Sequence, residues 1–146
     1  MLKLEDFVRT FEIQTKTDRD CETPVLLEFL TSISPIDSLL DIGAHYSINH
    51  YAREVRKIVK TYYAIDILPD PETESVVDKY IVGNANDDTL IPNSYDVVIC
   101  VSTIEHAGLS TYKGNNEEEK MRLFERCLEL AIKYVWISMP TGLPYI

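Results

Sequence analysis

Five short apolar runs that alternate with stretches of helical spacing constrain the fold more than any other feature of this sequence. Most of them are bounded by glycine, proline or other turn-forming residues, which is typical of strands buried on both faces of a parallel sheet. The runs are SLLDIG at 38–43, YYAIDI at 62–67, YIV at 80–82, YDVVICVS at 95–102 and YVWISM at 134–139. Strands that alternate with helices predict an α/β fold with a doubly wound, mostly parallel sheet of about five strands.

The residues that precede the first run predict two helices and a loop between them. Apolar residues recur at helical spacing near the start of the chain, and the polar stretch 14–22 then predicts the loop. Thr23 and Pro24 predict the beginning of the second helix, because threonine caps a helix and proline fits its first turn. Pro35 marks the end of that helix. The apolar residues of the two helices are Leu4, Phe7, Val8 and Phe11, then Leu26, Leu27 and Leu30.

Three further helical segments are predicted between the runs. Ser47 or Asn49 is expected to cap the first of them. The second, within 68–79, contains two prolines and has room for only a turn or two. Asn116 is expected to cap the third. The residues expected to face inward are Tyr51, Val55, Ile58 and Val59 in the first segment and Met121, Phe124, Leu128 and Ala131 in the third.

Polar clusters follow four consecutive runs, at 41–47, at Asp66, at 84–87 and at 102–106. In open α/β sheets, ligands bind beyond the carboxyl ends of the strands, at the point where the strand order reverses. Each cluster taken alone is also compatible with an ordinary turn, and Asp41 and Asp66 are both common turn residues. The occurrence of all four at consecutive strand ends indicates one binding site.

At these positions the sequence resembles the class I S-adenosylmethionine-dependent methyltransferases. LLDIGA resembles their first motif, and YYAIDI resembles the second, whose acid holds the ribose of the cofactor. GNANDDTLIPNSYDVVICVSTIEHAG resembles the stretch from the adenine site into the fourth strand, and Ile104-Glu105-His106 is the most specific match. The resemblance covers roughly 38–140. It implies a Rossmann-like sheet with the strand order 3-2-1-4-5, which here is expected to lack the last two strands of the family fold.

The resemblance implies S-adenosylmethionine as the cofactor and assigns residues to it. Asp66 would accept hydrogen bonds from the ribose hydroxyls, which suits an ionised carboxylate. Gly43 would let the backbone approach the ligand, and Asn84 resembles the position that reads the adenine amino group. Asp41 would orient the turn or reach the ammonium group of the cofactor. The cofactor-binding residues implied in this way are Asp41, Gly43, Ala44, His45, Asp66, Ile67, Asn84, Ala85, Asn86 and, at the methionine end, Ser102 and Thr103.

A catalytic role is predicted for the residues just past the fourth run. Methyl transfer is a displacement at an activated carbon, so the enzyme mainly supplies alignment, and some acceptors also need a base. We hypothesise that His106 is the general base, or holds the acceptor, and that Glu105 supports it. Taken alone, His106 is more typical of a structural histidine.

The first motif departs from the family pattern, and this keeps other functions open. The family usually has G-x-G-x-G, whereas here Gly43 is followed by His45 and Ser47. A side chain at position 45 would crowd the methionine end of the cofactor unless the loop swings outward. The main interpretation is a methyltransferase that acts on a small-molecule acceptor. The alternatives are a non-catalytic methyltransferase-like domain, which binds the cofactor weakly or serves as a partner subunit, and a nicotinamide-dependent oxidoreductase. The absence of G-x-G-x-x-G disfavours the oxidoreductase.

The amino-acid composition favours some classes of binding partner over others. The net charge of −10 disfavours nucleic acid and favours a small molecule. No apolar run reaches the roughly 20 residues that span a bilayer, and the N-terminus is unlike a signal peptide, so we expect a cytoplasmic protein without a membrane partner. The three cysteines have neither disulfide-framework nor metal-site spacing. We expect a single domain over 1–146, with an N-terminal helical cap at 1–34 and a Rossmann-like core at 35–146. Its uncovered last strand predicts a homodimer.

Overall fold

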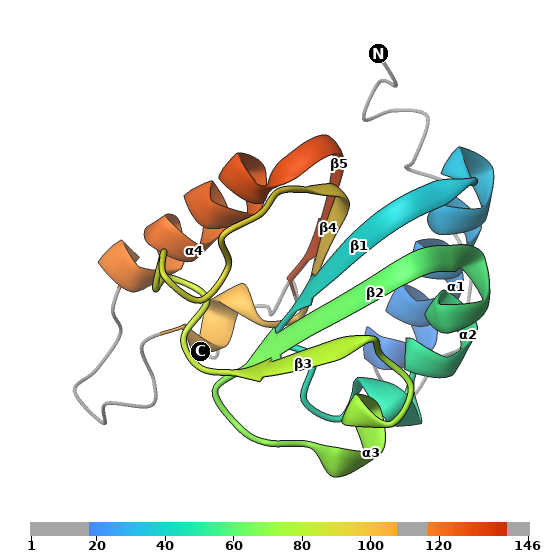
Figure 1. Cartoon of the computed structure of the whole chain (residues 1–146), viewed down its shortest axis with the longest axis horizontal. Coiled ribbons are helices and arrows are strands. Elements are labelled where there is room, and N and C mark those ends of the chain that lie inside the picture. Colours follow the sequence, from blue (N-terminus) through green and yellow to red (C-terminus); the bar gives the residue numbers. More distant parts are fainter. Residues whose placement is uncertain (1–17, 108–116, 140–146) are drawn as a thin grey trace, which may run out of the picture.

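The computed structural model describes residues 18–107 and 117–139. They form a five-stranded sheet in the order β3-β2-β1-β4-β5, in which every pair of neighbouring strands is parallel (Figure 1). The strands are β1 Ile36–Ile42, β2 Val59–Asp66, β3 Lys79–Val82, β4 Tyr95–Val101 and β5 Ala131–Ser138. The predicted fold class and strand order are confirmed. The order reverses between β1 and β4, which is where ligands bind in such sheets.

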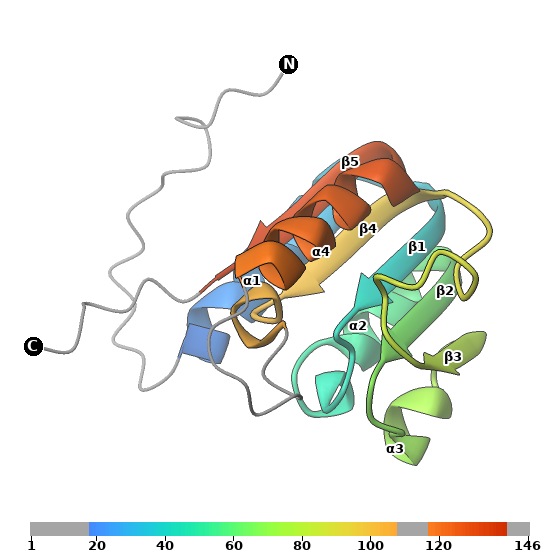
Figure 2. The ribbon, with the colours of Figure 1, turned by 90° about the vertical axis from the view of Figure 1, so that its left-hand side faces the viewer.

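Helices cover both faces of the sheet, as Figure 2 shows from the side. Helices α1 and α2 contribute to the core on one face, and α4 contributes to the core on the other. The short helix α3 occupies the connection between β2 and β3 and has one turn, as predicted. None of the helices in the described ranges has the length and apolar character needed to cross a membrane. The helices are α1 Asp18–Ile33, α2 Ala52–Ile58, α3 Pro71–Glu74 and α4 Glu117–Leu130, with 3-10 turns η2 Ser47–Asn49 and η3 Ile104–His106.

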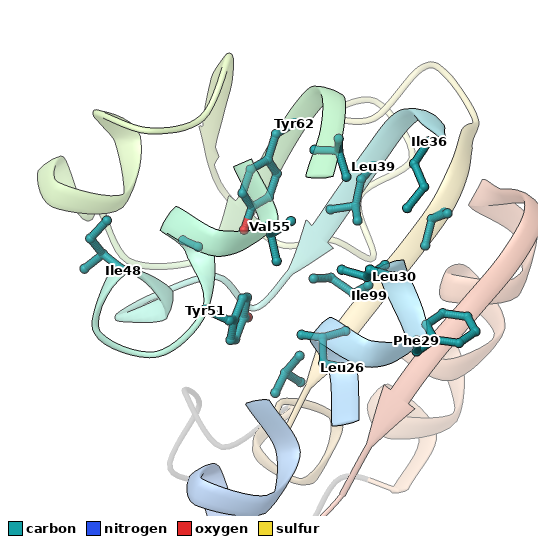
Figure 3. Packing of buried hydrophobic residues seen from close by; sticks show 14 residues of the cluster. Leu26, Phe29, Leu30, Ile36, Leu39, Ile48, Tyr51, Val55, Tyr62 and Ile99 are labelled. Atoms are coloured by element: carbon teal, nitrogen blue, oxygen red, sulfur yellow. The ribbon is translucent and has the colours of Figure 1, made fainter. Parts of the chain in front are cut away.

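The core between the sheet and helices α1 and α2 is built from fully buried aliphatic side chains (Figure 3). Leu26 and Leu30 of α1 and Val55 of α2 have no exposed surface and pack in one cluster with Leu39 and Ile99 of the sheet. The other residues predicted to face inward from this region are buried, as Tyr51 and Val59, or partly buried, as Ile58 and Leu27. Full burial of each such side chain contributes about 1.5–3 kcal/mol.

The core on the opposite face is closed by α4. Leu123, Cys127 and Leu130 of this helix pack with Val98 and Cys100 of β4 in a second cluster. Every residue of β4 is buried. A strand covered by helices on both sides must be apolar nearly throughout, which explains the continuous apolar run seen in the sequence.

Helix α1 differs from its prediction. The predicted loop at 14–22 is wrong for residues 18–22, because α1 already includes Asp18 and continues through Pro24. A proline inside a helix costs about 3 kcal/mol. Burial of Leu26, Phe29 and Leu30 offsets this cost, so tertiary packing overrides the local signal for a helix start.

The predicted helix caps also differ. Neither Ser47 nor Asn49 caps α2 with its side chain, and both lie in the preceding 3-10 turn. Tyr46, which precedes that 3-10 turn, donates its backbone N–H to Oδ2 of Asp70 at 2.8 Å. This partner lies 24 residues further along, in the connection between β2 and β3, so local spacing does not reveal it.

The apolar stripe predicted for the last helix is wrong. Met121, Phe124 and Leu128 are exposed, with 56%, 37% and 52% of their surface accessible. The buried face instead consists of Leu123, Arg126, Cys127 and Leu130, and Ala131 already belongs to β5. Two apolar stripes run along this helix, and only packing on the sheet decides which one is buried. The predicted helix near Leu4 to Phe11 and the cap at Asn116 lie outside the described residues.

Candidate functional site

A cleft of about 450 Å³ is lined by residues at the carboxyl ends of β1, β2, β3 and β4. This volume is typical of clefts that hold small-molecule ligands. The residues predicted from the sequence that line the cleft are Gly43, His45, Asp66, Ile67, Asn84, Ala85, Asn86, Ser102, Thr103 and His106. The fold therefore brings the polar clusters of four strand ends to a single place.

The Asp66 carboxylate lies beside the first turn. Its Oδ2 accepts a hydrogen bond from the backbone N–H of His45 at 3.0 Å, and its Oδ1 accepts one from the N–H of Leu68 at 2.9 Å. The carbonyl of Ile65, the preceding residue, accepts from the N–H of Gly43 at 2.8 Å. These bonds hold the end of β2 and the turn after β1 together. The remaining lone pairs of the carboxylate are available to further donors.

Gly43 occupies a position that no other residue fits. Its φ is +81°, in the left-handed region, and a Cβ built on it would lie 2.1 Å from Oγ1 of Thr103. The turn after β1 therefore approaches the end of β4 so closely that a side chain is excluded. Glycine is the residue that tolerates both conditions.

After Ala44, two consecutive residues of the turn, His45 and Tyr46, carry aromatic rings. The rings of His45 and Tyr46 lie 3.8 Å apart between centroids, and both residues line the cleft. Tyr46 adopts φ 64° and is 60% exposed. Nδ1 of His45 is buried and has no hydrogen-bond partner among the described residues. A ring thus stands where the family pattern has glycine, without closing the cleft.

Asp70 holds the turn after β1 in place through hydrogen bonds. Burial raises the pKa of its carboxyl group, but hydrogen bonds from Thr73 and from the N–H of Tyr46 outweigh that effect and hold the pKa below its ordinary value of 3.8. Asp70 is thus an anion that accepts hydrogen bonds from two sides. It ties the turn after β1 to helix α3.

Asp41 does not line the cleft. It is fully buried, and its Oδ1 and Oδ2 accept hydrogen bonds from the hydroxyls of Tyr51 and Tyr62 at 3.1 and 2.9 Å. Both rings are visible in the α1 and α2 core in Figure 3. Burial and the nearby Asp41 raise the pKa of Tyr62, which keeps its hydroxyl protonated as a donor. Direct contact of Asp41 with a ligand in the cleft is not supported by this arrangement. Ala44 and Glu105 are likewise absent from the lining.

The segment after β3 forms a polar turn at the cleft. Oδ1 of Asn84 accepts from the N–H of Asn86 at 2.9 Å. Nδ2 of Asn86 donates to Oε2 of Glu119 at 3.2 Å, whereas its Oδ1 is buried without a partner among the described residues. Nε of Arg126, on α4, donates to the carbonyl of Ala85 at 3.3 Å. The backbone of this segment is therefore anchored, and one amide oxygen is left to accept from a donor.

The segment after β4 carries the candidate catalytic pair. His106 has 69% of its side chain exposed and lines the cleft, and its Nε2 lies 3.7 Å from Oε1 of Glu105. This distance permits an electrostatic interaction when the imidazole is protonated but exceeds that of a hydrogen bond. Ser102, at φ 46°, donates its hydroxyl to Oε1 of Glu22 on α1.

Sequence reasoning missed several residues of the cleft. Leu68 directly follows Ile67, a predicted site residue, so its place in the chain was a usable signal. Glu119 and Leu123 come from α4, and their approach depends on how that helix packs. Within the described residues, no group of three or more histidine, cysteine or acidic side chains is arranged to hold a metal ion.

Known structures share this fold. No family model and no curated protein matches the sequence. Magnesium protoporphyrin IX methyltransferase of Synechocystis PCC 6803 with bound SAH has a TM-score of 0.63 at 11% identity, over 95% of this chain and 66% of that one. N-methyltransferase NodS of Bradyrhizobium japonicum WM9 in complex with S-adenosyl-L-homocysteine has 0.59 at 9%, over 88% and 65%. The amino pentose methyltransferase CalS10 of Micromonospora echinaspora, with bound SAM, has 0.55 at 12%, over 80% and 48%.

The chain spans at most about two thirds of the length of these proteins. At identities of 9–12% the likeness concerns the fold. The shared feature is the parallel sheet in the order 3-2-1-4-5 with its helices on both faces. The chain therefore has the Rossmann-like fold of the S-adenosylmethionine-dependent methyltransferases.

Proposed function

We propose that the protein binds S-adenosylmethionine in this cleft and transfers its methyl group to a small-molecule acceptor. The observation that carries the proposal is the Asp66 carboxylate, which lies at the end of β2 within hydrogen-bond distance of the turn that follows Gly43. A carboxylate at this position can accept hydrogen bonds from the two hydroxyls of a ribose. Its approach to the first turn brings the sugar and the rest of an adenosine ligand within reach of one cleft.

The residues of the cleft fit this cofactor. The described lining contains Asp66 and Glu119 but no lysine or arginine, which suits a ligand that carries a sulfonium and an ammonium group. Ile67 and Leu123 offer apolar surface for the adenine ring. The amide oxygen of Asn86, which has no hydrogen-bond partner in the part of the chain that the structure describes, can accept from the amino group of the adenine. In this assignment Asn84 and Ala85 contribute the polar turn beside the ring, and Ser102 and Thr103 flank the methionine end.

The chain contributes alignment and exclusion of water. When bound, S-adenosylmethionine supplies a methyl group already activated by its sulfonium. Gly43 permits the close approach of the backbone, and Asp66 fixes the ribose, so the reacting carbon would be held in one orientation. Holding two reactants in place accounts for a large part of the acceleration in such reactions.

His106 is the residue we propose for proton removal from the acceptor or for holding it. Its exposed imidazole reaches the cleft, and Oε1 of Glu105 lies 3.7 Å from its Nε2, where Glu105 can support it. We expect His106→Ala to reduce turnover by about 10²-fold or more if it acts as a base. Unchanged turnover with a true acceptor would remove His106 from the mechanism.

A small-molecule acceptor is favoured over nucleic acid. The net charge is −10, and phosphate binding requires a basic surface. Two of the similar structures are enzymes of small molecules by their names, a magnesium protoporphyrin IX methyltransferase and an amino pentose methyltransferase. The identity of the acceptor is a separate question, because acceptor sites in this fold vary with the surrounding loops.

Calorimetric titration with S-adenosylmethionine and S-adenosylhomocysteine tests the cofactor. We expect both to bind, and Asp66→Ala to weaken binding by about 10-fold to 100-fold, the loss typical of hydrogen bonds to a charged group. Asp37→Ala is the matched control, because Asp37 is exposed near the opposite end of β1. Binding that is absent from the wild-type protein, or equal in Asp66→Ala, would contradict the proposal.

A non-catalytic domain is the alternative, and the first turn is the observation that favours it. His45 and Ser47 stand where later glycines are usual, which can weaken cofactor binding. Calorimetric titration with the cofactor, together with an assay of methyl transfer, distinguishes the two functions. Cofactor that binds but gives no methylated product with any acceptor in a metabolite pool would favour the alternative.

We further propose that two copies pair through the outer edge of β5. This strand is at the edge of the described sheet, and an uncovered edge is a template for another strand. Helix α4 contacts β5, and its side chains Met121 and Leu128 are exposed. In a dimer with a two-fold axis, the β5 edge and the α4 surface of one copy would face the same surfaces of the other copy. A strictly monomeric mass in light scattering at high concentration would contradict pairing. The single domain and the cytoplasmic location stay predictions.

A further inference from the structure

The end of β4 contains a serine in an unusual conformation. Ser102 lines the cleft and adopts φ 46°, in the left-handed region that favours glycine. Its backbone N–H donates to the carbonyl of Ser138 at 3.0 Å, so the residue still belongs to the hydrogen-bond pattern of the sheet. A non-glycine residue held in this region costs on the order of 1–3 kcal/mol and persists only where surrounding contacts impose it.

The contact that accompanies this conformation comes from a distant part of the chain. The hydroxyl of Ser102 donates to Oε1 of Glu22, which lies on α1, 80 residues earlier. A hydroxyl has one hydrogen and two lone pairs. Because the hydrogen is committed to the carboxylate, the oxygen of Ser102 can act toward the cleft only as an acceptor. The neighbouring carboxylate also makes that oxygen a stronger acceptor.

A ligand group that meets this oxygen must therefore donate hydrogen bonds, and a positive charge would suit the nearby carboxylate. Thr103, the next residue, also donates its hydroxyl, to the carbonyl of Val101 at 3.0 Å, and so presents lone pairs as well. An ammonium group carries three donors and no acceptor, which matches this surface. A phosphate or a carboxylate does not match it.

The residue expected to serve the ammonium group of the cofactor is not available for it. Asp41 is fully buried, and both of its oxygens accept from tyrosine hydroxyls on the α1 and α2 side of the sheet. We infer that Ser102 and Glu22 form the ammonium subsite of the cleft, with Ser102 as the residue that contacts the ligand and Glu22 as its positioning residue. This inference rests on the proposed function and assigns one end of its cofactor.

Three adenosine thioethers test the subsite because they differ only at the amino acid end. S-adenosylhomocysteine carries both the ammonium and the carboxylate, its decarboxylated analogue keeps the ammonium alone, and 5′-methylthioadenosine has neither. We expect Glu22→Gln in the full chain to weaken the first two by about 10-fold, because the amide lacks the negative charge that strengthens the Ser102 oxygen as an acceptor and favours an ammonium group. Its affinity for 5′-methylthioadenosine should stay within about twofold.

Matched variants separate this role from a structural one. Glu28→Gln changes an exposed carboxylate on the same helix and should alter no affinity. Ser102→Gly removes the hydroxyl while tolerating the left-handed backbone, and it should reproduce the ligand pattern of Glu22→Gln. The double variant should lose no more than either single one, since the two residues act as a unit. Glu22→Asp should restore part of the lost affinity.

Each remaining outcome decides something. If Glu22→Gln weakens all three ligands equally, or weakens none, the subsite assignment is overturned. Weakening of S-adenosylhomocysteine alone, with the decarboxylated analogue unaffected, would assign the pair to the carboxylate and also overturn it. Wild-type protein that binds none of the three ligands would overturn the proposed function itself, and the subsite with it.

Discussion

The two halves of the cleft are held by contacts of very different range along the chain. In the half proposed for adenosine, Oδ1 of Asp66 accepts from the N–H of Leu68, and Oδ1 of Asn84 from that of Asn86, each two residues further on. In the half proposed for methionine, the hydroxyl of Ser102 reaches Glu22 across 80 residues of sequence. The first half contains local turns, although Oδ2 of Asp66 also accepts from the N–H of His45 across 21 residues. The second half exists only when α1, β1 and β4 are packed together.

This difference explains where sequence patterns succeed. Aspartate and asparagine that accept from a backbone N–H two residues later form turns that are recognisable from local sequence. A contact between residues far apart leaves no local pattern, because neither partner is unusual in its own segment. Substitutions of single residues in or beside the cleft should affect the two halves unequally or leave both halves intact.

The largest effect is expected at Gly43. Gly43→Ala would place a Cβ 2.1 Å from Oγ1 of Thr103 in a left-handed conformation. We expect a loss of about 3 kcal/mol in the free energy of unfolding, from backbone strain and overpacking together. Urea denaturation measures it.

The matched glycine lies in the other half. A Cβ at Gly83 would meet Cδ1 of Leu90 at 2.3 Å, the end of a flexible side chain that can move away. Gly83→Ala should therefore cost less than about 1 kcal/mol. Equal costs at the two glycines would mean that the methionine half is not packed as tightly as the structure has it.

A smaller effect on stability and none on binding is expected at Asp41. Asp41→Asn leaves one tyrosine hydroxyl facing an amide N–H₂ in a buried site, which should cost about 1–3 kcal/mol. Affinity for S-adenosylhomocysteine should stay within about twofold, because the side chain lies outside the cleft. Calorimetry on the folded variant measures it, and a loss of about 10-fold or more would return Asp41 to the binding site.

Asp70 should make stability depend on pH through the turn after β1. Its pKa is lower in the folded chain than in the unfolded chain, so its contribution is present above the ordinary value of 3.8 and is lost as pH falls through the folded-state pKa. Asp70→Asn should therefore cost about 1 kcal/mol at pH 7 and less at pH 3. Denaturant titrations at both pH values measure the difference, with Asp37→Asn as the exposed control. A cost independent of pH would contradict this role.

The smallest effect is expected at His45, where the first motif departs from the family pattern. His45→Gly removes a ring that lines the cleft and keeps the backbone N–H that donates to Asp66. Affinity for S-adenosylhomocysteine should rise about threefold, or roughly 0.7 kcal/mol, with no change for 5′-methylthioadenosine. Competition binding measures both. Weaker binding of both ligands would show that the ring supports the cleft instead of crowding it.

The helices illustrate why part of the fold was not predictable. The apolar spacing of α4 is compatible with two buried stripes, and the predicted one, with Met121, Phe124 and Leu128, is exposed in the structure. Leu123 and Cys127 are buried because they pack on β4, and this orientation also lets the guanidinium of Arg126 donate to the carbonyl of Ala85 after β3. Such a condition involves another segment, so no helical pattern contains it.

The amino-acid sequence alone determined the strands, their α/β class and the polar residues at their ends, because burial on both faces requires continuous apolar runs and because parallel strands end at one edge. Only the tertiary structure decided that Asp41 is buried and hydrogen-bonded to Tyr51 and Tyr62, away from the cleft, and that Glu22 accepts a hydrogen bond from Ser102. The physical reason is the distance along the sequence over which each kind of interaction acts. Periodicity and turn chemistry act within a few residues, whereas the partner of a buried polar group is whichever segment the packed fold brings to it.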